Sequence, residues 1–148
     1  MQIPRPKVSD KTGNLCFGCG KDNPIGLKLQ FTDDGGIARG EFIAGELHQG
    51  WGEIVHGGIL GTLLDEACGY AIMWTGLNCV TAKSTTRFQN LAPINKPIQI
   101  TAQITKKTSR LIETEATLSL KDGTIIAKNS SIFYVVEKIP VSQSPSSD

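Results

Sequence analysis

Apolar and polar residues alternate with a period of two in several segments of this chain, most clearly over residues 98–105. Such alternation predicts strands that bury one face, because successive side chains of a strand point to opposite faces of a sheet. Turn sequences, including Asp33-Asp34-Gly35-Gly36 and Asp122-Gly123, separate several of these segments. We expect six strands, at residues 27–32, 37–44, 79–88, 98–105, 111–120 and 125–136.

One segment, from Gly58 to about Thr75, has helical spacing instead. Its apolar residues cover most of the helix circumference, which predicts a buried helix. These residues are Ile59, Leu60, Leu63, Leu64, Ala67, Cys68, Ala71 and Ile72. Two strands, one buried helix and four further strands predict an α+β fold, an antiparallel sheet packed on a single long helix. The helix covers one sheet face, so the other is available to an oligomer partner or a ligand.

A stripe of small and polar residues interrupts the apolar surface of this helix. Its members, three and four positions apart, are Gly58, Gly61, Thr62, Asp65 and Gly69. Aspartate is a poor helix-interior residue by intrinsic propensity, so something other than propensity must account for Asp65. The stripe predicts a shallow groove, with Asp65 at its centre, that a thin ligand or a second chain can approach closely.

A Gly-rich loop at residues 45–58 leads into the helix, and long loops in compact domains are often functional. It ends in His56-Gly57-Gly58. A helix N-terminus leaves backbone N–H groups unpaired, and glycine lets a ligand oxygen approach them. Such donors for a developing oxyanion, with a carboxylate two turns further on, predict an acyl-transfer site.

Chain length and net charge limit the number of domains and the kinds of binding partner. A chain of 148 residues favours one domain, and 15 Lys+Arg against 14 Asp+Glu leave it nearly neutral. We therefore expect no nucleic-acid partner and no attraction to an anionic membrane surface. The N-terminus lacks the apolar core of a signal peptide, and no run is long enough for a membrane span. These features predict a cytoplasmic protein.

The four cysteines include the motif Cys16-x-x-Cys19. A zinc site would need two more ligands, and Cys68 and Cys79 belong to elements of other kinds. The motif does not open a helix, where a lowered thiol pKa would be expected. We therefore expect free thiols in a packed N-terminal turn, no metal site and no cofactor, with disulfide exchange as a distant alternative.

The order of elements, with His56-Gly57-Gly58 opening the helix and Asp65 nine residues after the histidine, resembles the hotdog-fold acyl-CoA thioesterases. The phenylacetate-pathway and human thioesterase-superfamily branch is the most similar type. The segments Asn14–Gly20 and Asn23–Leu27 are similar to an N-terminal signature of many such proteins. The resemblance implies a hotdog domain over residues 15–137, a sheet of about six strands wrapped around the central helix. Residues 1–14 are then an irregular segment, and 138–148 a disordered tail.

The resemblance also implies roles for particular residues. The Gly57 N–H polarises the thioester carbonyl, and Asp65, supplied by the other subunit, acts as nucleophile or activates water. Thr81 orients that water. Many of these enzymes carry an asparagine six residues before the histidine of this motif, where this chain has Gly50, so Gln49 supplies the amide or the role is absent.

The remaining candidates contact substrate or support the loop. His56 is expected to hold the loop by side-chain hydrogen bonds rather than to transfer protons, since no serine lies at a nucleophile elbow. Gly58 and Glu66 are expected beside the substrate, and Glu66 becomes the working carboxylate if the helix phase is shifted by one residue. Candidates to bind the coenzyme A phosphates are Lys83 and Arg87, followed by Lys106, Lys107 and Arg110.

These observations favour an acyl-CoA thioesterase, with an acyl-CoA as its partner molecule. The resemblance implies that two chains pair edge to edge, giving a homodimer or homotetramer with active sites at the subunit interface. Two alternatives stay open. One is a non-catalytic hotdog protein that binds acyl-CoA, and the other is a hotdog 3-hydroxyacyl-thioester dehydratase that uses His56 and Asp65.

Overall fold

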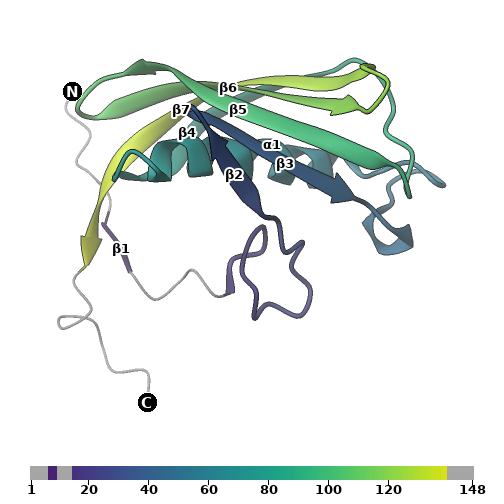
Figure 1. The fold of residues 1–148 in the computed structure, drawn as a ribbon. Helices are drawn as coiled ribbons and strands as arrows, with labels where there is room; N and C mark the ends of the chain where they lie inside the picture. Colours follow the sequence, from purple (N-terminus) through teal and green to yellow (C-terminus); the bar gives the residue numbers. More distant parts are fainter. Residues whose placement is uncertain (1–6, 10–14, 140–148) are drawn as a thin grey trace.

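The computed structural model describes residues 7–9 and 15–139, which form one curved sheet around a single long helix (Figure 1). Six strands are antiparallel, in the order β4–β7–β6–β5–β3–β2, and α1 lies along one face. The bounds are β2 Phe31–Asp34, β3 Ile37–Ile43, α1 Gly57–Met73, β4 Asn78–Phe88, β5 Pro97–Lys107, β6 Leu111–Leu120 and β7 Ile125–Ile139. The predicted α+β class, with one helix and six antiparallel strands, is confirmed.

The two ends of the domain differ from the sequence prediction. A short strand, β1 (Lys7–Ser9), pairs in parallel with the end of β7, so the predicted irregular segment 1–14 is wrong at these residues. β7 continues to Ile139, two residues into the predicted tail. The rest of both predicted segments, residues 1–6, 10–14 and 140–148, lies outside the described residues.

The predicted strand at residues 27–32 is shorter, because only Phe31–Asp34 belongs to the sheet. Leu27 and Leu29 are buried, as their alternation with polar residues predicts. Their backbone N–H groups donate to the carbonyls of Phe17 and Gly18, each at 2.9 Å, rather than to a neighbouring strand. The alternation therefore predicted the burial of both leucines correctly, but their backbone pairs with the loop that contains Cys16 and Cys19 and not with a strand.

Helix α1 provides most of the inner core. Its buried residues are Leu60, Leu63, Leu64, Ala67, Cys68, Ala71 and Ile72, which face apolar residues of the sheet such as Ile98, Ile112 and Leu118. The predicted small-residue stripe remains partly exposed, with Asp65 half-buried. The preceding loop contains one short 3-10 turn, η2 (Glu46–His48). No helix among the described residues is long and apolar enough to cross a membrane.

Strand β4 lies at one edge of the sheet. Within the described residues it pairs only with β7, and its register shifts between Thr81 and Lys83. Side chains 81–85 are all exposed. A long edge strand presents unpaired backbone groups, which native proteins cover or pair with another chain.

Replacing Leu64 by alanine tests the contribution of α1 to the core. Leu64 is fully buried, so the lost contacts and the remaining cavity should lower the free energy of unfolding by about 2–5 kcal/mol. The same substitution at Leu47, which is 91% exposed, should change it by less than about 0.5 kcal/mol. Urea denaturation monitored by circular dichroism measures both, and similar losses would contradict the assigned helix orientation.

Candidate active site

Asp65 and Thr81 lie together although they belong to different elements. The Thr81 hydroxyl, on edge strand β4, donates a 2.6 Å hydrogen bond to Oδ1 of Asp65 on α1. Both residues line a pocket of about 840 Å³, with Glu66, Gly69, Tyr70, Met73, Val80 and Phe133 among its other walls. The bond fixes the carboxylate, and Oδ2 has no hydrogen-bond partner among the residues that the structure describes, so it can meet a water molecule or a substrate carbon.

The charge in this pocket is concentrated on two neighbouring carboxylates. Neither Asp65 nor Glu66 forms a salt bridge with any residue of the part that the structure describes. Burial, followed by the charge of Asp65, raises the pKa of the Cys79 thiol to about 12. This thiol therefore stays protonated near neutral pH and is a weak nucleophile. The Asp65 and Glu66 carboxylates of this pocket can take up a proton or attack a carbonyl carbon.

The start of α1 presents one backbone donor. His56 is the N-cap residue, and its Nδ1 accepts a 2.8 Å hydrogen bond from the Gly58 N–H. The Gly57 N–H has no partner among the described residues and is exposed. The expectation of two free donors is therefore corrected to one. His56 occupies the other through its ring nitrogen.

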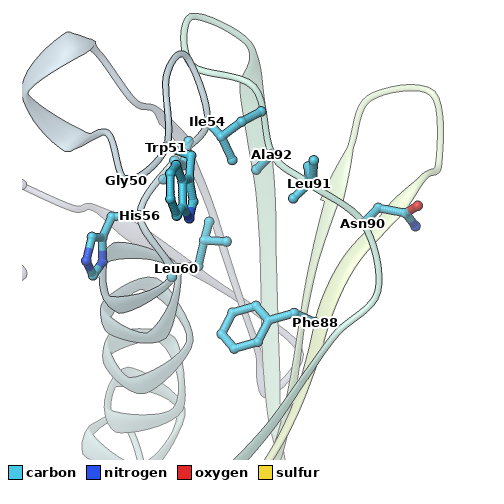
Figure 2. Close-up of a pocket in the computed structure, with 11 residues that line it drawn as sticks. Gly50, Trp51, Ile54, His56, Leu60, Phe88, Asn90, Leu91 and Ala92 are labelled. Carbon is cyan, nitrogen blue, oxygen red and sulfur yellow. The ribbon is translucent and has the colours of Figure 1, made fainter.

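A second pocket, of about 560 Å³, opens beside Gly57 (Figure 2). Its walls are mainly apolar, and Trp51, Leu60 and Phe88 project into it from the loop, the helix and the end of β4. Trp51 is 88% exposed and Leu91 is 73% exposed. Sequence reasoning missed these wall residues. The available signal was a tryptophan inside a Gly-rich loop, where nothing local gives it a core position.

The side chain of Gln49 is engaged within its own loop. Its Nε2 donates to the Glu46 carbonyl at 2.7 Å, and its Oε1 accepts from the Glu53 backbone N–H. Gly50 lines the pocket beside Gly57, but a Cβ there would lie 3.3 Å from the His56 Cα, which is tight. In this conformation the Gln49 amide bonds backbone groups of its own loop, and position 50, where many related enzymes carry asparagine, has no side chain.

The length of α1 separates the Gly57 N–H from the Asp65 carboxylate of the same chain. Gly57 and Asp65 are eight residues apart in α1, which is about 12 Å at 1.5 Å per residue. They also line different pockets. A single thioester carbonyl cannot contact the Gly57 N–H and the Asp65 carboxylate of the same chain. The same argument keeps His56 and Asp65 of one chain apart.

Lys83 and Arg87, the candidates to bind coenzyme A phosphates, line neither the pocket of Asp65 nor the pocket of Gly57. Lys83 is exposed on edge strand β4. Arg87 lines a separate groove with Thr85, Glu115, Lys128 and other residues of β4, β6 and β7, without any residue of the helix. Within one chain, neither Lys83 nor Arg87 lies beside Asp65 or Gly57, so their proposed contact with coenzyme A stays a prediction.

Comparison with known proteins identifies the family and the fold of this chain. The family model described as the Thioesterase superfamily matches residues 52–127, just over half of the chain. The chain therefore belongs to the thioesterase superfamily, and its sheet around one helix is the hotdog fold. Among curated proteins, none matches this chain in sequence.

Three solved structures illustrate the similarity. The thioesterase superfamily protein RHA08564 is 26% identical to this chain, with a TM-score of 0.74. The match covers 78% of this chain and 61% of that protein. Zebrafish thioesterase superfamily member 2 is 26% identical, with a TM-score of 0.71 over 84% of this chain and 91% of its own. A hypothetical thioesterase from Streptococcus pneumoniae, solved with coenzyme A, is 17% identical, with a TM-score of 0.69. The match covers 72% of this chain and 87% of that protein.

Removing the helix cap tests the role of His56. His56→Ala deletes the acceptor for the Gly58 N–H and should lower the free energy of unfolding by about 1 kcal/mol. His56→Asn keeps a side-chain acceptor at the N-cap and should retain most of this stability. Chemical denaturation compares the three proteins. Equal stability of the alanine and wild-type proteins would show that the capping bond contributes nothing.

Proposed function

We propose that this protein hydrolyses an acyl-CoA thioester to a carboxylic acid and free coenzyme A. The observation that carries this proposal is the Asp65–Thr81 pair, a carboxylate fixed by a 2.6 Å hydrogen bond at the wall of a large pocket. Such a carboxylate can remove the proton of an attacking water or attack the carbonyl carbon itself. The Thr81 hydroxyl can accept a hydrogen bond from that water while it donates to Asp65.

The Gly57 N–H supplies the oxyanion donor. As water or Asp65 adds to the carbonyl carbon, negative charge develops on the carbonyl oxygen, and a preorganised backbone N–H stabilises it. The positive end of the α1 dipole acts in the same direction. Collapse of this intermediate breaks the carbon–sulfur bond, and the leaving thiolate takes up a proton, on the water route the one that Asp65 removed, to give free coenzyme A. Where Asp65 itself attacks, the acyl group stays on its carboxylate as an anhydride, and a water molecule then hydrolyses this anhydride to the carboxylic acid and restores Asp65. The apolar pocket beside Gly57 suits the chain adjoining the carbonyl.

The active site is proposed to lie between two chains. Gly57 and Asp65 of one chain are too far apart to act on one carbonyl, so one chain supplies the donor and the other supplies the carboxylate. Edge strand β4 carries Thr81, and its exposed edge suits pairing with the same strand of a second copy. Two-fold symmetry then creates two identical composite sites.

The relatives support an acyl-CoA as the substrate. The Streptococcus pneumoniae protein was solved with coenzyme A. It was also solved with an aspartate or a threonine replaced by alanine, and these positions are 16 apart in its chain, as Asp65 and Thr81 are here. The equal spacing supports the choice of this pair.

One observation favours a second candidate, a hotdog protein that binds acyl-CoA without hydrolysing it. Position 50 has no side chain, and the amide of Gln49 is hydrogen-bonded to loop backbone. A thioester carbonyl would then have the Gly57 N–H as its donor without help from the Gln49 amide or from a side chain at position 50. Binding without turnover is the outcome that would support this candidate.

Acyl-CoA turnover tests the proposal directly. Thiol release from acetyl-, hexanoyl-, palmitoyl-, benzoyl- and phenylacetyl-CoA should be measurable for at least one substrate. Asp65→Asn should reduce it by about 10²–10⁴-fold, because the amide is neither a base nor a nucleophile. Asp22→Asn, the same change at an exposed acid, is the matched control. Turnover that survives Asp65→Asn on every substrate would remove Asp65 from the mechanism.

The oxyanion donor can be deleted at a single position. Gly57→Pro removes the N–H, and proline is well tolerated at the first position of a helix. Gly57→Ala keeps the N–H, and its Cβ would meet only the Phe88 ring at 3.8 Å. We expect the proline variant to lose about 10²–10³-fold in kcat and the alanine variant to remain active. Equal loss in both would indicate a steric effect instead.

Mixing two inactive variants tests the composite site. Random pairing of Asp65→Asn chains with Gly57→Pro chains gives mixed dimers in which one site has both intact groups and the other has neither. Activity should return to about a quarter of the wild-type value per chain. Mixtures that stay inactive, although mixed dimers are detected by mass spectrometry, would place each site within one chain.

A further inference from the structure

We propose that Cys16, Cys19 and Glu66 form a binding site for a thiophilic divalent cation of the zinc type. The sequence offers only two adjacent ligands, and the prediction of no metal site rested on that shortage. The fold brings a third ligand from the helix, 50 residues further along the chain. The inference is independent of the proposed hydrolysis.

The three ligand atoms already converge. The two thiol sulfurs and a Glu66 carboxylate oxygen all lie within 4.8 Å of one another, and Cys16 Sγ is 3.2 Å from Glu66 Oε1. Ligand atoms bound to a tetrahedral Zn²⁺ at 2.0–2.3 Å lie about 3.3–3.8 Å apart. Small side-chain movements are therefore enough to place a cation between them.

The loop that carries the two thiols is held by backbone hydrogen bonds. The Gly20 N–H donates to the Cys16 carbonyl at 2.9 Å, closing a tight turn around the motif. The Phe17 and Gly18 carbonyls accept from residues 27 and 29, whose leucine side chains are buried. This anchoring limits the movement of the thiols relative to the body of the domain. An anchored CxxC motif loses less conformational entropy on binding a metal ion than an unstructured one would.

Gly18 lets the loop close over the third ligand. A Cβ at this position would overlap with Cγ and Cδ of Glu66, so only glycine allows the carboxylate to lie against the turn. The Glu66 side chain therefore packs directly on the two-cysteine turn instead of extending into solvent. This contact fixes the carboxylate beside the thiols.

The charge of the cluster suits a cation. Glu66 forms no salt bridge within residues 15–139, and Asp65 is the next residue along the helix. Cation binding releases one proton from each thiol and leaves two thiolates and one carboxylate as ligands. All three residues line the pocket of about 840 Å³ that also contains Asp65, so a water molecule can complete the coordination. Sulfur ligands select zinc-type ions over Mg²⁺ or Ca²⁺.

The experiment uses the full chain without an affinity tag, reduced with a phosphine and freed of metal by a chelator. Titration with Zn²⁺ alone should show one ion bound per chain, with release of thiol protons into a weak buffer. Co²⁺ should give thiolate charge-transfer bands and the strong visible bands of tetrahedral coordination. Mg²⁺ should not compete.

Matched variants locate the site. Cys16→Ser and Cys19→Ser should each weaken Zn²⁺ binding by about 100-fold or more, and Glu66→Gln by about 10-fold or more. Cys79→Ser, the same change at a cysteine of the same pocket outside the cluster, should leave the affinity unchanged. If a serine variant does not fold, zinc-edge X-ray absorption of the wild-type protein counts the sulfur ligands directly, and two are expected.

Several results would overturn the proposal. Wild-type protein with all four thiols reduced that binds no stoichiometric Zn²⁺ excludes the site. Equal affinity in the Cys16→Ser, Cys19→Ser and wild-type proteins places any bound ion elsewhere. An absorption spectrum without sulfur ligands does the same. Failure of the hydrolysis proposed above would change none of these results.

Discussion

The packing of α1 against the concave face of the sheet is the constraint on which the rest of the structure depends. Its apolar residues are fully buried there, and this fixes the rotation of the helix about its axis. The remaining stripe must then face away from the sheet, which leaves Asp65 half-buried beside the edge strand. An acid in a helix interior is tolerated because the Thr81 hydroxyl satisfies one of its oxygens.

The rigidity of the same helix separates the Gly57 N–H from the Asp65 carboxylate, the two groups to which catalytic roles are proposed. A helix cannot bend Gly57 and Asp65 toward one point, since eight residues span about 12 Å. The fold therefore places the Gly57 N–H and the Asp65 carboxylate of one chain in two different pockets, and the edge strand β4 pairs only with β7 within the described residues. The proposed association of two copies would bring the Gly57 N–H of one chain to the Asp65 carboxylate of the other and cover the edge of β4.

Neighbouring acids on α1 have different surroundings because successive helix residues point about 100° apart. Asp65 meets the hydroxyl of Thr81 on β4, whereas Glu66 meets the thiol of Cys16 in the N-terminal loop. One helix turn therefore connects two clusters that share a pocket. If the helix were rotated by one residue about its axis, Glu66 would face Thr81 in place of Asp65. The observed contacts of Asp65 with Thr81 and of Glu66 with Cys16 exclude this rotation.

The sequence by itself determined the elements with strong periodicity, namely the helix, most strands and the buried leucines, because alternation and helical spacing are local consequences of burial. Residue type and spacing in the sequence also made His56, Gly57 and Asp65 the candidates for an acyl-transfer site. Only the tertiary structure decided that Leu27 and Leu29 pair with a loop, that His56 takes the Gly58 N–H, and that Glu66 joins Cys16 and Cys19. These contacts join residues whose local patterns carry no information about one another, so they exist only once the sheet has closed around the helix.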